Sequence, residues 1–276
     1  MYSLKTSVWS SYFVDMSPEE MVKTFAAGGW QVSELSDEHG AVLLERGNPV
    51  KEGRAFRAYA ADQGMSFPQG HLWLRSDIAG YDRLETVDQL KKWLDLYLAV
   101  GVKAAVLHPA GASRYLAGDD PQAIDEASIE SLTSLAAHLK GTDMDICLEN
   151  LYSHAASCQH LQRLIAAAGG KNLGICLDTG HLNLAHRDQA SFINQAGDQL
   201  KALHITDNQE KTDQHLLPYG PGTVDWITVV RSLQAIGYQG LFNYEIPGER
   251  KAPLSILKAK LDYIKAMTER LFAEAG

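Results

Sequence analysis

The feature that most constrains the fold is a short apolar run at residues 175–181, ICLDTGH, which ends in a carboxylate and a histidine. Short apolar runs bounded by turn residues are typical of strands that are buried on both faces. Comparable runs at residues 146–150, 202–207 and 241–246 also deliver glutamate, aspartate or histidine at their ends. A carboxylate at the end of a buried strand is costly unless a positive group meets it. The four segments therefore predict buried strands whose ends carry the chemistry.

Strand-like and helix-like segments alternate along the whole chain. The expected strands are residues 4–9, 30–35, 65–71, 103–108, 145–149, 173–178, 202–206 and 241–246. Alternation at this spacing predicts a parallel sheet. Eight strand–helix units suit a single α/β domain spanning residues 1–276, a closed (β/α)8 TIM barrel, with a doubly wound open sheet as the alternative. The barrel is favoured because polar residues end the third to eighth strands, and a barrel brings those ends to one mouth.

The last four expected strands supply the central candidate site, which consists of Glu149, Asp178, His204 and Glu245. Adjacent strands lie about 4.8 Å apart, so these side chains can meet around one point. Three carboxylates that close repel one another strongly unless they are protonated or bind a cation. Oxygen and imidazole donors without thiolate favour Mn²⁺, Mg²⁺, Co²⁺ or Zn²⁺. The alternative is that each acid caps a helix or pairs with a lysine.

A second group of polar residues is expected around the same mouth: His71, His108, His181, Asp213 and His215. His71 and His108 end the third and fourth strands, and His181 follows the aspartate of the sixth strand by three residues. A single histidine at a strand end is more often a neutral, hydrogen-bonded side chain than a ligand. Several of them converge here, so we treat this group as possible additional metal ligands.

Composition bears on partners and location. Acidic residues outnumber basic ones by 34 to 25, giving a formal net charge of −9, and no basic stripe with interleaved aromatic residues is visible. This balance argues against nucleic acid as a partner. No apolar run approaches the about 18 residues of a membrane span, and no signal-peptide pattern begins the chain. Cys147, Cys158 and Cys176 are expected to be buried reduced thiols, which suits a cytoplasmic protein.

These motifs resemble the xylose isomerase-like superfamily of TIM barrels, which includes sugar phosphate isomerases and epimerases, inosose dehydratases and AP endonucleases of the endonuclease IV type. The resemblance covers nearly the whole chain and is carried by residues 147–150, 177–181, 204–208, 213–216, 220–226 and 244–245. It implies a metal-dependent sugar or sugar-phosphate isomerase or epimerase that works by proton transfer through a metal-bound enediolate. In such enzymes the counterparts of Glu149, Asp178, His204 and Glu245 hold one divalent metal.

The resemblance also implies catalytic roles. Glu149 and Glu245 would exchange the substrate proton from opposite faces of the carbon beside the carbonyl, and His181 would stabilise the intermediate by hydrogen bonding. Trp9 and Trp73 at the mouth suit a pocket that stacks a sugar ring, with packing in a lid or in the core as the alternative. Glu34 on the second strand can hydrogen-bond a substrate hydroxyl or form a salt bridge toward the helices.

Two other activities stay open. In endonuclease IV, the counterparts of the five additional residues complete a site for three zinc ions, so a trinuclear zinc phosphoesterase is one alternative. A keto-polyol dehydratase, which would use the same proton abstraction, is the other. The chain also departs from the ketose epimerases at Glu210 and Lys211, where those enzymes carry an arginine. Homo-oligomers are common for this architecture, but no exposed stripe in the sequence marks an interface.

Overall fold

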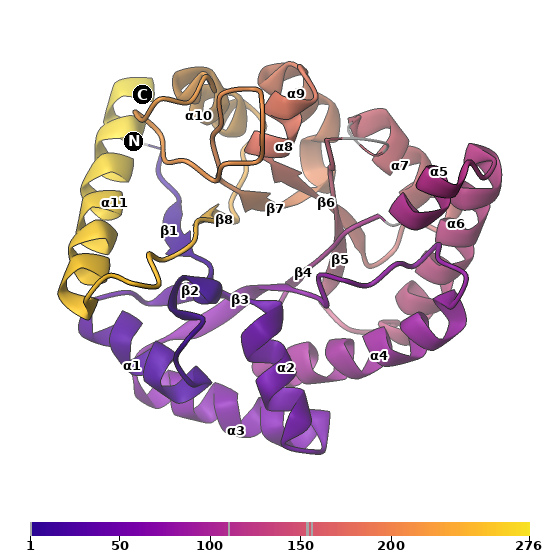
Figure 1. Ribbon diagram of the computed structural model, residues 1–276, viewed down its shortest axis with the longest axis horizontal. Coiled ribbons are helices and arrows are strands. Elements are labelled where there is room, and N and C mark those ends of the chain that lie inside the picture. The colour runs from indigo at the N-terminus through magenta and orange to yellow at the C-terminus, as the bar shows by residue number, and fades with distance from the viewer. Residues whose placement is uncertain (1, 110, 153–154, 156) are drawn as a thin grey trace.

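Parallel strands form the inner wall of the structure and helices cover its outside (Figure 1). The computed structural model describes residues 2–109, 111–152, 155 and 157–276. The strands are β1 Lys5–Val8, β2 Val32–Leu35, β3 Ser66–His71, β4 Ala104–Leu107, β5 Asp145–Glu149, β6 Leu173–Asp178, β7 Leu200–His204 and β8 Leu241–Tyr244. Each lies where the sequence predicts a strand, with ends that differ by at most two residues.

Helices follow the strands in order. The α-helices are α1 Pro18–Ala27, α2 Asp37–Glu45, α3 Pro49–Asp62, α4 Arg83–Val100, α5 Ala112–Ala117, α6 Pro121–His138, α7 Cys158–Ala167, α8 Thr179–Leu184, α9 Gln189–Ala196, α10 Trp226–Ala235 and α11 Leu254–Ala275. The described residues also form two 3-10 helices, η1 Ser10–Phe13 and η2 Gly197–Gln199. The capping box at the start of α1, in which Ser17 and Glu20 bond to each other's backbone N–H, explains why that helix begins at Pro18.

The strands close into a ring. Strands β2 to β7 form one parallel sheet in chain order, and β1 pairs with β8 in parallel. Single bridges between Trp9 and Glu34 and between Ile205 and Tyr244 join the two sheets on both sides. The closed ring confirms the predicted TIM barrel and shows that the open-sheet alternative is wrong.

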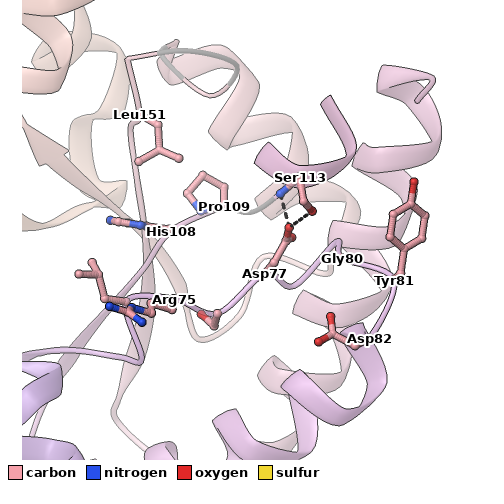
Figure 2. Close-up of a pocket in the computed structure, with 12 residues that line it drawn as sticks. Arg75, Asp77, Gly80, Tyr81, Asp82, His108, Pro109, Ser113 and Leu151 are labelled. Carbon is pink, nitrogen blue, oxygen red and sulfur yellow. Dashed lines mark hydrogen bonds between the residues drawn. The ribbon is translucent and has the colours of Figure 1, made fainter. Parts of the chain in front are cut away.

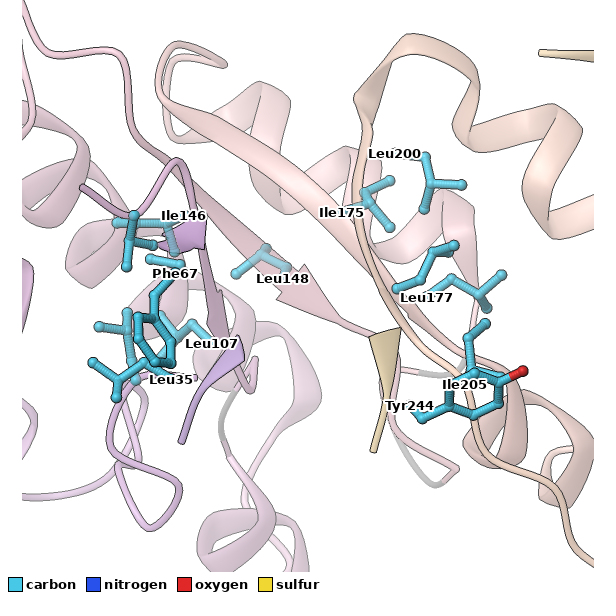
Figure 3. Close-up of a cluster of buried hydrophobic side chains, with 14 of the residues drawn as sticks. Leu35, Phe67, Leu107, Ile146, Leu148, Ile175, Leu177, Leu200, Ile205 and Tyr244 are labelled. Atoms are coloured by element: carbon cyan, nitrogen blue, oxygen red, sulfur yellow. The ribbon is translucent and has the colours of Figure 1, made fainter. Parts of the chain in front are cut away.

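Residues alternate between the two faces of each strand, as the period of two requires. Outward side chains such as Ile146, Leu148, Ile175 and Leu177 belong to the main hydrophobic core with the helices (Figure 3). Their neighbours Cys147 and Cys176 form a separate small cluster with Ala104, Val106 and Ala202. All three cysteines are buried free thiols, as predicted. The next inward residue after Cys147 is Glu149, and the next after Cys176 is Asp178. The alternation along each strand therefore directs these two acids into the mouth of the barrel.

Three short helices are absent from the sequence prediction: α2, α5 and α8. Helix α8 is one of them because Asp178, taken only as a strand end, is also the N-cap of α8 and accepts a hydrogen bond from the His181 backbone N–H at 2.6 Å. Helix α2 begins in the same way at Ser36. Within the described ranges, no helix is both long enough and apolar enough to pass through a bilayer.

Candidate metal centre

Four buried side chains meet at the C-terminal ends of neighbouring strands. Glu149, Asp178 and His204 are the last residues of β5, β6 and β7, and Glu245 directly follows β8. Parallel pairing sets Asp178 beside His204 in the β6–β7 register. One ligand atom from each of the four lies within 4.8 Å of the corresponding atom of every other. The structure therefore brings together the four residues that the sequence singles out.

Most of the atoms that face one another in this cluster form no hydrogen bond with the described residues. Among the described residues, both carboxylate oxygens of Glu149, Oδ2 of Asp178 and Nδ1 of His204 are buried and form no hydrogen bond, although imidazole nitrogens lie within ion-pair distance of Glu149. Leaving charged oxygens unpaired in the interior costs several kcal/mol or more, so these atoms need a cation or protons. His204 Nδ1 lies 3.2 Å from Glu149 Oε2 and 3.5 Å from Glu245 Oε2. A set of oxygens and one imidazole nitrogen around a shared point suits a divalent metal.

Glu34 fixes the orientation of His204 by contacting Nε2, the ring nitrogen that faces away from the other cluster residues. Its Oε1 lies 3.0 Å from His204 Nε2, and its Oε2 accepts a hydrogen bond from the side-chain amide of Asn243. A carboxylate partner places the imidazole proton on Nε2, which leaves the Nδ1 lone pair directed at the cluster. Glu34 therefore faces the barrel interior rather than the helices, and it contacts a candidate ligand.

His71 and His108 approach Glu149 from the other side. Their Nε2 atoms lie 3.5 and 3.3 Å from Glu149 Oε2. His71 Nδ1 lies 2.7 Å from the Leu72 carbonyl oxygen, and its buried Nε2 has the ion-pair contact with Glu149 but no hydrogen bond among the described residues. His71, Glu149 and His204 form a second group whose ligand atoms lie within 4.8 Å of one another. This geometry places two of the five additional candidates at the cluster.

The other three additional candidates form a group nearer the solvent. Asp213 Oδ2 lies 3.3 Å from His181 Nε2 and 3.2 Å from His215 Nε2. The Nδ1 atoms of the two histidines contact backbone carbonyl oxygens, those of Asn150 and Glu245, at 3.0 and 2.5 Å. Both imidazoles are therefore oriented so that their Nε2 atoms converge on one carboxylate.

The ionisation of the cluster follows from burial and close charges. Burial alone would raise the pKa of Glu149, but the His204, His108 and His181 imidazoles hold that pKa well below its usual range. Burial raises the pKa of Glu245 to about 7 against the opposing effect of His204, with a further contribution from the Glu149 charge. The two carboxyl groups, although neighbours, therefore have pKa values displaced in opposite directions.

The histidines respond to the same charges. Burial would lower the pKa of His71, but its ion pair with Glu149 raises that pKa to about 9. In the same way Asp213 and Glu245 outweigh burial and raise the pKa of His215 to about 10. His108 differs, because burial dominates and its pKa is lowered.

Several supporting residues were not anticipated from the sequence. Asn150 exchanges two hydrogen bonds with the backbone of Asp178, at 2.9 and 2.8 Å. The Thr206 hydroxyl donates to Asp178 Oδ1 at 3.0 Å. The Tyr97 hydroxyl donates to the His71 carbonyl at 2.6 Å. The sequence signals for Asn150 are its place directly after Glu149, at the end of a buried strand, and its inclusion in the 147–150 segment that carries the family resemblance; neither shows its contact with Asp178.

A cavity of about 400 Å³ opens over the cluster, and Glu149, His181, Asp213, His215, Glu245 and Trp9 are among the residues that line it. The Trp9 indole N–H donates to the Ile246 carbonyl at 2.9 Å, which holds the ring at the wall. Trp73 is half-buried against the hydrophobic core and is not among the lining residues. Glu210 contacts His186 and Thr223, on the outer part of the β7–α10 segment.

Comparison with known proteins identifies the family. The family model described as "Xylose isomerase-like TIM barrel" matches residues 29–267, and the chain belongs to this family. One relative is a D-psicose 3-epimerase from Enterocloster bolteae, 25% identical over 251 residues, which cover 87% of this chain and 79% of the relative. Another is an uncharacterized protein, y4fM, from Sinorhizobium fredii, 27% identical, with 87% of this chain and 75% of the relative covered.

Solved structures show the same fold. A D-psicose 3-epimerase from Clostridium cellulolyticum, determined with D-tagatose, superposes with a TM-score of 0.79 at 17% identity over 98% of this chain and 99% of that one. At this level of identity the likeness extends to the fold alone. The relatives nevertheless include several sugar epimerases, among them a fructoselysine 3-epimerase from Escherichia coli.

Proposed function

We propose that the protein is a divalent-metal-dependent sugar or sugar-phosphate isomerase or epimerase. The observation that supports this most directly is the buried cluster of Glu149, Asp178, His204 and Glu245, in which facing atoms of the first three form no hydrogen bond within the described part of the chain. A relative matched over 87% of this chain is named D-psicose 3-epimerase, and one matched over 54% is named L-ribulose 3-epimerase. A cavity of about 400 Å³ over the cluster lies within the range that suits a small ligand.

The four clustered residues would hold the metal, which when bound polarises a carbonyl and so makes the neighbouring C–H bond more acidic. Glu149 and Glu245 are the proton-transfer residues. One carboxylate takes the proton from the carbon beside the carbonyl, and the other carboxyl group returns a proton to that carbon. Two carboxyl groups whose pKa values are displaced in opposite directions suit this division of roles.

His181 is the third catalytic residue of the proposal. Its Nδ1 lies 3.2 Å from Glu149 Oε1, and its ring lines the cavity. An imidazolium at this position can donate a hydrogen bond to the developing negative charge of an enediolate. The ring of Trp9 forms part of the wall against which the apolar face of a sugar can pack.

Exchange of substrate hydrogen with solvent deuterium tests the proposal. The metal-loaded protein is incubated with D-fructose, D-psicose and D-tagatose in D₂O, and label at the carbon beside the carbonyl is followed by NMR. We expect Glu149→Gln and Glu245→Gln to reduce the exchange rate by about a thousandfold or more, since each removes a proton-transfer group. Glu269→Gln, at an exposed position on α11, is the matched control. Exchange that persists in both cluster variants would refute the assignment.

A second candidate function is supported by one observation. Beyond the four-residue cluster, His71 and His108 surround Glu149, and Asp213 binds two further imidazoles. This arrangement offers ligands for more than one ion, as a trinuclear zinc phosphoesterase needs. Metal analysis separates the candidates: about one Mn or Co per chain favours the epimerase, and close to three Zn with cleavage of an abasic-site oligonucleotide favours the phosphoesterase. The net charge of −9 opposes binding of DNA.

A further inference from the structure

A second cavity lies beside the metal centre. Its volume is about 750 Å³, and it is formed by the segments that connect β3 to α4 and β4 to α5. Leu74, His108 and Leu151 line both this cavity and the one over the metal cluster. Figure 2 shows His108 on one side of the cavity and Tyr81 on the other. A molecule whose reacting carbons face the cluster could therefore extend past His108 into this space.

Hydrogen bonds between the protein's own segments hold the walls of this cavity in place. The Asp77 carboxylate accepts hydrogen bonds from the Gly111 backbone N–H at 2.9 Å and from the Ser113 hydroxyl at 2.7 Å (Figure 2). It also accepts one from the Ala79 N–H, within its own segment, at 3.1 Å. Asp77 thus ties the two connecting segments together, and a preformed cavity of this kind is typical of binding sites.

Two polar groups in this cavity lack partners among the described residues. The Ser76 side chain is only 7% exposed, and its hydroxyl oxygen has no hydrogen-bond partner. A buried hydroxyl left unpaired is unfavourable, so Ser76 indicates a ligand that supplies the missing bond. The exposed Arg75 guanidinium, on the same wall, forms no ion pair or hydrogen bond within the part of the chain that the structure describes.

The charges in the cavity indicate what kind of ligand it suits. Arg75 is accompanied by the carboxylates of Asp77 and Asp82, so the lining has no net preference for an anion. The hydroxyl groups of a ligand can both donate and accept hydrogen bonds, so they suit a lining that mixes a guanidinium, carboxylates and a serine hydroxyl. The ring of Tyr81 adds an apolar surface, held in place by the Arg114 guanidinium 5.6 Å from its centroid and by a bond from its hydroxyl to Asp119.

We propose that this second cavity is a subsite for a further hydroxylated unit, such as a glycosyl group, carried by the sugar whose reacting carbons face the metal cluster. The inference rests on the proposed function for the identity of the reacting sugar. It names a larger substrate class than free monosaccharides: ketoses that bear a glycosyl substituent. Arg75 and Ser76 bind hydroxyls of that unit, and Tyr81 packs against its ring.

The test compares three probes on the metal-loaded protein: D-fructose, the glucosyl-fructose isomaltulose and fructose 6-phosphate. Affinity is measured by calorimetric titration, and solvent-deuterium exchange is followed in parallel. Arg75→Ala removes a charged donor, and Asp82→Trp fills the cavity at a residue whose side chain makes no cap bond to α4. Arg54→Ala, at an exposed position on α3, is the matched control for loss of an arginine.

We expect isomaltulose to bind at least about tenfold more tightly than fructose, and both cavity variants to remove about tenfold of that preference. The Arg54→Ala control should retain it. Equal affinity for the two sugars, or a preference that survives both variants, would overturn the subsite. Tighter binding of fructose 6-phosphate than of isomaltulose would overturn it too, because the cavity would then be an anion site.

The two hypotheses fail in different ways. Deuterium exchange with fructose but no preference for isomaltulose would refute the subsite and leave the proposed function standing. Binding of isomaltulose that depends on Arg75, without exchange in any ketose, would support the subsite and refute the proposed epimerase activity.

Discussion

The contact between Glu34 and His204 yields the sharpest prediction about the candidate metal centre. In the native arrangement the two oxygens of Glu34 face two donors, His204 Nε2–H and the side-chain amide of Asn243. Glu34→Gln keeps the shape of the side chain but supplies one acceptor and one donor. While Asn243 keeps the orientation in which its Oδ1 accepts from the Ser7 hydroxyl, one of two defects follows: the new amide N–H opposes a donor of Asn243, or His204 changes tautomer.

Both defects have a calculable consequence. A change of tautomer moves the His204 proton to Nδ1, the atom that lies 3.2 Å from Glu149 and 3.5 Å from Glu245, and removes the lone pair offered to the metal. Loss of such a partner lowers metal affinity by about 10- to 100-fold. If the tautomer is retained instead, a buried donor stays unpaired at a cost of about 1–3 kcal/mol.

Metal titration and thermal unfolding, at one fixed alkaline pH, measure the two outcomes. The double variant Glu34→Gln with Asn243→Asp is the decisive control, because it gives the new amide an acceptor and frees its oxygen for His204. The Ser7 hydroxyl, 2.7 Å from Asn243 Oδ1, can still donate to the new carboxylate. We expect the double variant to recover most of the lost affinity. Native affinity in Glu34→Gln, or no recovery in the double variant, would refute the reasoning.

Three further predictions follow from the structure. The pKa values of His71 and His215 are raised to about 9 and about 10, so if both bind metal their protons must be displaced, and metal affinity should rise with pH up to about 10. Calorimetry in buffers of different ionisation enthalpy would count the protons, and a flat pH profile would exclude both as ligands. Asn150→Ala removes two buried hydrogen bonds to Asp178 and should lower the free energy of unfolding by about 2–4 kcal/mol in denaturant titrations; a change below about 0.5 kcal/mol would contradict this. Ser17→Ala removes the N-cap of α1 and should lower the free energy of unfolding by about 1 kcal/mol in the same titrations. Ser17→Asp, which introduces another good N-cap residue, should lower it by less.

The elements that could be predicted from the sequence are those in which local pattern and final environment agree. The buried strands are apolar runs with acids or imidazoles at their ends, so Glu149, Asp178, His204 and Glu245 could be placed at one mouth from residue type alone. The closed ring followed from the number of units. Helix α8 could not be predicted, because Asp178 serves both as a strand end and as a helix cap.

Contacts between distant parts of the chain explain the rest of what was missed. Glu34 and His204 are separated by 170 positions, and no local pattern shows that one orients the other. For the same reason the half-buried packing of Trp73, and the loop-to-loop bonds of Asp77, came only from the folded structure. The sequence indicated which acids and imidazoles gather at the strand ends, whereas only the tertiary structure showed which residues contact and orient them.

The rates at which the buried cysteines react can report local opening of the barrel. Cys147 and Cys176 project into the closed interior, and burial raises the pKa of both, so the reactive thiolate is suppressed as well as shielded. An alkylating reagent can modify them only when neighbouring strands separate. Cys158, at the start of α7, would react after local fraying of that helix. Comparing the labelling rate of Cys147 and Cys176 with that of Cys158 would thus distinguish separation of the barrel strands from local fraying of helix α7.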